Sequence, residues 1–246
     1  MSKAVGCRTL SIGAGLALAI AGLGLAGCSG ADDNSTYVEQ PVEQLYNRGL
    51  DDLSAQEYKS AAKNFEEVDR QHPYSVWATK AQIMAAFADY ESKKYDEAII
   101  ALDRFIQLHP GHRDLPYAYY LKALCFYEQI SDVGRDQRVT QQALDALAEV
   151  VSRFPDSPYA RDARLKVELC IDHLAGKEMS VGRYYQKNQQ YIGAINRYRV
   201  VIERYQTTTH VPEALHRLVE SYLSLGVKSE AKEASAVLGY NFPGSE

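Results

Sequence analysis

Residues 95–110 read YDEAIIALDRFIQLHP and repeat the pattern of residues 58–73, which read YKSAAKNFEEVDRQHP. Each segment begins with Tyr, has Ala three residues later, a large apolar residue four residues after the Ala, and Pro twelve residues after the Ala. A small residue lets two antiparallel helices approach closely, and the large residue one turn further along fills the space beside it. Because Pro cannot continue a helix and restricts the residue before it, each segment is expected to be a helix that ends before its Pro.

The same pattern occurs five times along the chain, with its small residue at Ala61, Ala98, Ala143, Ala194 and Ala231. Three copies depart from it: the third and fifth lack the leading Tyr, Gln206 replaces the Pro of the fourth, and Ser235 replaces the large residue of the fifth. Successive Ala positions are 37, 45, 51 and 37 residues apart. The extra residues of the longer intervals are expected in loops or extended helices, chiefly at residues 131–140 and 176–190.

The five segments resemble the second helix of tetratricopeptide repeats, in which Ala, a large apolar residue and Pro recur in this order. Segments with the helical spacing of apolar residues precede them, and none shows the sustained alternation that is typical of a half-buried strand. The sequence therefore predicts an all-α, tetratricopeptide-like superhelical solenoid of five helix pairs, in which each repeat contacts its neighbours.

The first residues of the chain have the pattern of a secretion signal. Lys3 and Arg8 precede an uncharged stretch, whose apolar part at residues 10–26 is shorter than the ~20 strongly apolar residues of a membrane-spanning helix. The segment Leu25-Ala26-Gly27-Cys28 follows within this stretch and resembles the bacterial lipobox. An ordinary secretion signal, in which Cys28 has no special role, is the alternative.

The lipobox resemblance implies a lipoprotein signal peptide at residues 1–27 and cleavage before Cys28. It implies a covalent diacylglycerol on the Cys28 sulfur and an N-acyl chain (palmitate) on its amino group, with no other cofactor. Residues 28–40 are mostly polar and are expected to be a lipidated N-terminal tether. By the sorting rule of such lipoproteins, Ser29 implies a lipid-anchored protein at the periplasmic face of the outer membrane of a Gram-negative bacterium.

The charge of the chain argues against nucleic-acid binding. The chain has 27 basic and 32 acidic residues, a net charge of −5, and loss of residues 1–27 removes two basic residues and leaves −7. Binding to phosphates requires a basic surface, whereas a mildly acidic chain suits a basic protein partner.

No pattern in the sequence indicates catalysis. The chain lacks G-x-S-x-G, the Walker A motif, H-E-x-x-H and C-x-x-C. His72 and His109 each precede the Pro of a repeat, which indicates a role at the helix end rather than in a metal site. Cys125 and Cys170 lie in apolar helical segments, where two buried thiols are expected and a disulfide is the alternative. The chain is therefore predicted to be a binding protein and not an enzyme.

Three segments make the chain similar to the BamD family, the tetratricopeptide lipoproteins of the outer-membrane β-barrel assembly machinery. They are residues 46–90, GRDQ at residues 134–137, and LAGKEMSVGRYYQKNQQYIGAINRY at residues 174–198. The last two fall largely in the inserts and not at generic repeat positions. The resemblance implies a non-catalytic scaffold of the BAM complex. Its implied partners are the periplasmic POTRA region of BamA, other BAM subunits, and unfolded β-barrel precursors for insertion into the outer membrane.

The resemblance also divides the chain into an N-terminal half at residues 41–156, on the substrate side, and a C-terminal half at residues 157–246, on the BamA-docking side. The positions carried over for the BamA contact are Arg183, Tyr184, Asn196 and Arg197. The candidates for a substrate pocket, which would hold an extended segment ending in an aromatic residue, are Tyr46, Tyr58, Tyr74, Trp77 and Phe87. For each aromatic residue the alternative is packing in the interior, and for Arg197 it is a solvated charge or an ion pair within the repeat.

Two other classes of protein share part of these features. Another periplasmic tetratricopeptide lipoprotein, such as a pilus-assembly pilotin or a coordinator of cell-wall synthesis, would have the anchor and the repeats but lack the inserts GRDQ and EMSVGRYY. An enzyme acting on the cell wall would need a pair of carboxylates or a metal ion in a cleft. The two inserts favour the resemblance to the BamD family over both of these alternatives.

Overall fold

The computed structural model describes residues 39–244, and these residues form ten α-helices and no strand. The helices are α1 Val42–Ser54, α2 Tyr58–Gln71, α3 Val76–Glu91, α4 Tyr95–Leu108, α5 Leu115–Tyr127, α6 Arg138–Arg153, α7 Ala160–Lys187, α8 Tyr191–Arg204, α9 Val211–Ser224 and α10 Lys228–Asn241. The predicted signal peptide, Cys28 and nearly all of the predicted tether lie outside the described residues. Within those residues, no helix combines the length and the apolar character needed to cross a membrane.

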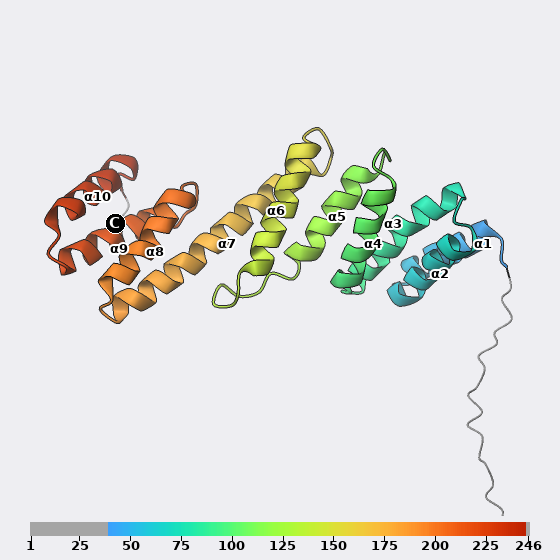
Figure 1. The fold of residues 1–246 in the computed structure, drawn as a ribbon, viewed down its shortest axis with the longest axis horizontal. Coiled ribbons are helices and arrows are strands. Elements are labelled where there is room, and N and C mark those ends of the chain that lie inside the picture. The colour runs from blue at the N-terminus through green and yellow to red at the C-terminus, as the bar shows by residue number, and fades with distance from the viewer. Residues whose placement is uncertain (1–38, 245–246) are drawn as a thin grey trace, which may run out of the picture. The chain divides into compact units, whose positions relative to one another are not determined.

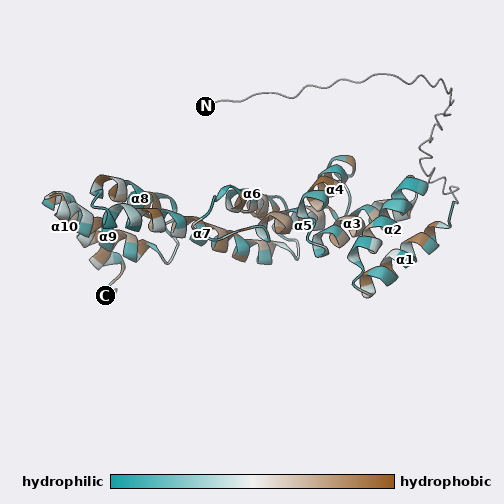
Figure 2. Cartoon of the chain, turned by 90° about the horizontal axis from the view of Figure 1, so that it is seen from below, coloured by the Kyte–Doolittle hydropathy of each residue, from teal (hydrophilic) through white to brown (hydrophobic). Residues whose placement is uncertain are grey.

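The helices form five antiparallel pairs, α1–α2 to α9–α10, and each helix packs mainly against the next one in the chain (Figure 1). The first helices of neighbouring pairs also touch at the start of the array, where α1 contacts α3 and α3 contacts α5. Each helix carries both hydrophilic and hydrophobic residues (Figure 2), as expected for helices that bury one stripe against a neighbour. The predicted all-α solenoid of five helix pairs is confirmed.

The second helix of every pair ends in the same way. The residue after it has φ between −121° and −131° and ψ between 44° and 58°, and carries a ring in each case. These residues are His72, His109, Phe154, Tyr205 and Phe242. The predicted helix-end role of His72 and His109 is confirmed. Because Gln206 follows Tyr205 and α8 still ends at Arg204, the Pro of the repeat is not required for this ending.

In four of the five pairs, all except α5–α6, the turn between the two helices has a left-handed residue two positions before the second helix. Gln56, Lys93 and Gln189 have φ of 61°, 62° and 59° at this position, and Gly226 has 78°. A side chain in this region costs roughly 1 kcal/mol relative to Gly, so the short turn is retained against a local penalty. Packing of the two helices against each other offsets the cost of this backbone conformation.

The extra residues of the longer repeats lie in two different structures. Residues 131–137 form a loop between α5 and α6, although residues 138–140 already belong to α6. Residues 176–187 extend α7 to 28 residues, twice the length of most helices in the array. A loop and an extended helix were the two expected solutions, and the chain uses both.

The closest contact within a helix pair joins a small residue to a large one. A Cβ on Gly49 of α1 would lie 2.7 Å from the Phe65 ring of α2, and a Cβ on Gly182 of α7 would lie 2.5 Å from the Tyr198 ring of α8. Where the second helix has Leu instead, the first helix has Ala. These pairs are Ala86 with Leu102 and Ala123 with Leu147, and all four residues are fully buried. In these four helix pairs, a small residue on the first helix therefore accompanies a larger residue on the second.

Cys125 and Cys170 are both free and buried, in two different clusters of the core. Burial raises the pKa of the Cys125 thiol to about 12 and that of the Cys170 thiol to about 11. The expectation of two buried thiols is confirmed, and the protonated thiols behave as small apolar side chains.

The fit of Gly49 against Phe65 can be tested by adding one methyl group. Gly49→Ala is expected to lower the free energy of unfolding by roughly 1–2 kcal/mol, because overpacking outweighs the ~1 kcal/mol that Ala gains over Gly in a helix. Urea unfolding followed by circular dichroism measures the change.

Two controls accompany this variant. Gly239→Ala in α10 is expected to be neutral or stabilising, because Gly239 is exposed and no atom lies within 4 Å of the point that its Cβ would occupy. Phe65→Leu is expected to be less destabilising when added to Gly49→Ala than when made alone, because the pair then has the sizes of Ala86 and Leu102. Additive losses in the double variant would contradict the size rule.

Candidate binding site

The first helices of successive pairs, α1, α3, α5, α7 and α9, border common hollows, and the surface that they present is here called the first-helix face. An open hollow of about 330 Å³ lies near its start, against α1, α3 and α5. Its lining residues are Tyr46, Lys80, Ile83, Met84, Arg113, Asp114, Tyr117 and Tyr159. Rings and an apolar floor combine here with two basic side chains, which is the composition of a peptide-binding surface.

Tyr46 and Trp77 are the two predicted pocket residues that the structure brings together. The ring centroid of Tyr46 lies 4.8 Å from that of Trp77 and 5.4 Å from that of the buried Phe65. The Lys80 ammonium lies 5.4 Å from the centre of the Trp77 ring. These contacts place Tyr46 partly in the core and partly in the wall of the hollow, so packing and ligand contact are both available to it.

The structure does not bring the other three predicted pocket residues to this hollow. Tyr58 lies at the start of α2 and lines a separate hollow of about 430 Å³ with Gln56 and Ser92. Tyr74 lies between α2 and α3 and is fully exposed. Phe87 packs against the core cluster of α3, α4 and α5, which is the interior role that was the alternative for each aromatic residue.

Sequence reasoning missed most of the lining, including Tyr117 and Tyr159. Their ring centroids are 5.4 Å apart, and Tyr159 also stacks on Tyr120 at 5.1 Å. Tyr120 donates a 2.5 Å hydrogen bond to Asp162, which fixes the ring stack to α7. The run of tyrosines at residues 117–120 was a visible signal, but its partner lies about 40 residues further along the chain, so only the tertiary fold reveals the cluster.

The chemistry of the hollow suits an aromatic side chain next to a carboxylate. Burial raises the pKa of Tyr117 to about 12 and also raises the pKa of Tyr46, so both hydroxyl groups stay protonated and can donate hydrogen bonds. Lys80 is exposed, and the Arg113 guanidinium is exposed with Asp114 3.5 Å away. The two cations can bind an anionic group while the rings contact its apolar neighbour.

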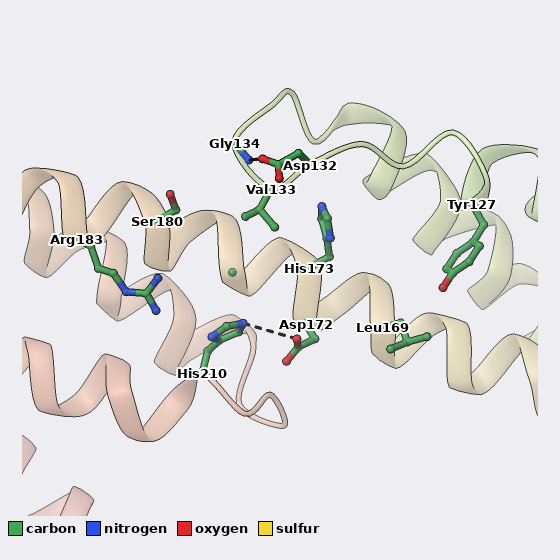
Figure 3. A pocket seen from close by; sticks show the side chains of 11 residues that line it. Tyr127, Asp132, Val133, Gly134, Leu169, Asp172, His173, Ser180, Arg183 and His210 are labelled. Carbon is green, nitrogen blue, oxygen red and sulfur yellow. Dashed lines mark hydrogen bonds and ion pairs between the residues drawn. The ribbon is translucent and has the colours of Figure 1, made fainter. Parts of the chain in front are cut away.

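A second hollow, of about 620 Å³, lies further along the first-helix face, where the 131–137 loop meets α7 (Figure 3). The Lys177 ammonium donates to the carbonyls of Gly134 and Arg135 at 2.9 and 3.2 Å, and so fastens this loop to α7. Gly176 lies between the loop and the α8–α9 turn, since a Cβ on it would be 3.3 Å from His210 and 3.7 Å from Val133. The two inserts of the sequence therefore meet at one place.

Charged and imidazole groups line the second hollow. His210 lies 3.6 Å from a carboxylate oxygen of Asp172 and approaches α7 from the α9 side, whereas His173 points from α7 toward the loop (Figure 3). The Nε2 atom of His173 is buried without a hydrogen-bond partner. No group of three or more potential metal ligands occurs in residues 39–244.

Arg183 contributes to this second hollow and is engaged by α9. Its guanidinium donates to both carboxylate oxygens of Glu213, at 2.9 and 2.6 Å. These hydrogen bonds lower the pKa of Glu213, which also pairs with Arg217 at 3.5 Å. A partner protein that contacts Arg183 therefore meets a linked charge network and not a single cation.

Arg197 lies on α8 and pairs with Glu178 of α7 at 3.1 Å, the ion pair within the repeat that was the alternative for this residue. Glu178 and Arg183 are five residues apart on α7, so they point about 140° apart around the helix. The structure therefore brings Arg183 and Arg197 to one helix pair but not to one face. Tyr184 and Asn196 are both exposed, and Tyr184 is 65% accessible.

Comparison with known proteins gives a consistent set of relatives. The family YfiO, described as outer membrane lipoprotein, matches residues 38–238. The outer membrane protein assembly factor BamD of Caulobacter vibrioides is 52% identical over 231 residues, which cover 93% of this chain and 76% of the relative. The BamD of Rickettsia prowazekii is 46% identical and covers 94% and 91%, and that of Neisseria meningitidis serogroup A is 37% identical and covers 91% and 89%.

Among solved structures, a tetratricopeptide-repeat protein of Thermus thermophilus is similar with a TM-score of 0.41 and 18% identity. The likeness covers 83% of this chain and 93% of that chain. It is too distant to carry an argument about function.

Proposed function

The chain belongs to the YfiO family of outer membrane lipoproteins and is an outer-membrane protein assembly factor, and we propose that it works by holding other proteins on its first-helix face. The family match extends from the start of the described residues into α10. Association with the outer membrane and with the BAM complex follows from the family description and from the name of its relatives. The three relatives described above are all named BamD, which favours this family over the rival class of periplasmic lipoprotein.

The observation that carries the proposal is the hollow formed by Tyr46, Met84 and Tyr117 with Lys80 and Arg113 at its margin. It offers rings for an aromatic side chain and cations for a terminal carboxylate. We assign to it the extended C-terminal segment of an unfolded β-barrel precursor, ending in an aromatic residue. Holding this segment apart from other chains prevents the strand-to-strand association to which exposed β-segments are prone.

The mechanism is binding without bond chemistry, so the chain acts as a non-catalytic scaffold. The C-terminal half, at residues 157–246, is assigned to BamA through its periplasmic POTRA region. The charge network of Arg183 with Glu213 and the pair of Arg197 with Glu178 give α7, α8 and α9 fixed charges to present to this partner. A lipid anchor on Cys28 holds the scaffold at the periplasmic face of the outer membrane, where each modest contact gains from a high local concentration.

The assignment of the first hollow predicts a dependence on two cations. Lys80→Glu and Arg113→Glu are each expected to weaken binding of a synthetic peptide ending in Phe by roughly 5- to 20-fold, because a charge-assisted contact at an exposed site is lost and reversed. Fluorescence anisotropy of a labelled peptide measures the dissociation constant.

Two controls separate this effect from a general loss of charge. Lys59→Glu reverses an exposed charge at the separate hollow of α2, and is expected to leave the affinity unchanged. The same peptide with a C-terminal amide is expected to bind the unchanged protein weakly and to be insensitive to Lys80→Glu. Equal binding of the acid and the amide would refute the carboxylate contact.

The assignment of the C-terminal half predicts that Arg197→Glu lowers recovery of BamA in co-purification from membranes by several-fold. The introduced carboxylate would repel Glu178 and the hydrogen-bond acceptor of BamA that Arg197 is proposed to contact. Arg199→Glu is the matched control, since Arg199 lies on the same helix, is exposed and pairs along α8 with Glu203. Equal recovery of BamA with both variants would remove Arg197 from the interface.

The anchor predicts that Cys28→Ala leaves the protein unprocessed or released from membranes, because no thioether to diacylglycerol can form on Ala. Fractionation and mass spectrometry of the N-terminus measure both outcomes. Normal outer-membrane retention of this variant would contradict the anchor but not the peptide-binding hollow.

A further inference from the structure

We infer that the edge of the array around Tyr74 and Val76 rests on the phospholipid surface of the membrane to which the chain is tethered. The inference rests on the proposed anchor at Cys28 and goes beyond it, because an anchor alone leaves the orientation of the scaffold open. The edge is formed by the end of α2, the start of α3 and the end of α4.

The start of the described chain is fastened to this edge. The backbone N–H of Gln40 donates to the Gln71 side chain at 2.8 Å, and the Gln40 carbonyl lies 2.7 Å from Nε2 of His72. Gln71 is the last residue of α2 and His72 follows it. The described chain therefore begins at the end of α2, close in sequence to Tyr74.

The length of this segment limits how far the edge can be from the membrane. Glu39 lies eleven positions after Cys28, so the segment spans about 40 Å at most when fully extended. An anchor on Cys28 thus keeps the end of α2 within a short distance of the bilayer. Helix α10 packs against α9 and lies at the opposite end of the array.

This edge exposes apolar side chains that the array itself does not cover. Tyr74 is 100% exposed and Val76 is 78% exposed, and Leu108 at the end of α4 is 57% exposed. The ends of α2 and α4 lie together, because the Gln82 side chain donates to Asp69 at 2.8 Å and lies 3.1 Å from His109. Tyr is a residue type favoured at the boundary between lipid and water, where its ring meets the acyl chains and its hydroxyl meets the headgroups.

The charges of the edge are paired, which allows it to approach an anionic bilayer. Arg70 pairs with Glu67 at 2.5 Å, and Arg104 lies 3.8 Å from Asp69. The anchored chain, which lacks residues 1–27, has a net charge of −7, so as a whole it is repelled by acidic phospholipids. An edge whose charges are paired and whose exposed side chains include apolar ones avoids this repulsion. The contact is weak by itself and depends on the tether for its local concentration.

The experiment uses the single Trp of the chain as a movable probe. In full-length lipidated protein carrying Trp77→Phe, one variant has Tyr74→Trp and the matched control has Tyr240→Trp, since Tyr240 is an 87% exposed aromatic residue at the other end of the array. Both are reconstituted with vesicles of phosphatidylethanolamine and phosphatidylglycerol with brominated acyl chains, which quench an indole that enters the bilayer. Circular dichroism checks that both variants fold.

The expected result is that the Tyr74→Trp variant is quenched at least about twofold more than the Tyr240→Trp variant, with a blue-shifted emission. Flotation with the vesicles separates the two hypotheses. Protein that floats while both indoles are quenched equally overturns the edge and leaves the anchor standing, whereas protein that does not float overturns both. A third outcome is that vesicles do not quench the Tyr74→Trp variant and that its emission shifts to the blue only when BAM subunits are added. The edge would then contact a protein, and the inference would be overturned.

Discussion

The array depends on one steric constraint, the pairing of a small residue on the first helix with a large residue on the second. Gly49 faces Phe65 and Gly182 faces Tyr198, at distances that leave no room for a Cβ. Ala86 and Leu102 are buried in one core cluster and show the same combination of a small residue on the first helix and a larger one on the second. Close-packed interiors tolerate little change in volume, so these pairs set how near the two helix axes lie. The fifth helix pair differs, because it has Ser235 in place of the large residue.

Because each pair packs mainly against its neighbours, the repeats tolerate local differences without loss of the array. The 131–137 loop and the long helix α7 are the two largest differences, and Lys177 joins them by hydrogen bonds to the loop carbonyls. The second hollow is a direct result of this junction. A regular array of equal repeats would have no loop to lean over α7 and no such hollow.

The side chains of the two hollows suit binding to another protein chain. In the N-terminal hollow, tyrosine hydroxyl groups with raised pKa remain neutral donors beside two exposed cations. In the C-terminal half, the basic residues carried over from the family resemblance are held in ion pairs across helices. Such pairs add little stability at an exposed surface, but they fix the direction in which the charge points. The chain belongs to a family of outer membrane lipoproteins, and its relatives are named outer membrane protein assembly factors.

The sequence by itself determined the class of the fold, the number of helix pairs and the helix-end role of His72 and His109, because these depend on local spacing and on the backbone limits of Ala and Pro. Lipidation of Cys28 stays a prediction from its motif. Only the tertiary structure decided which tyrosines share a hollow, since Tyr117 and Tyr159 lie on different repeats. It also decided that Tyr46 and Trp77 meet while Phe87 is packed in the core, and that Arg183 and Arg197 point to different faces. The physical reason is that helical spacing defines which residues share a face of one helix, whereas contacts between helices depend on how the small and large residues fit.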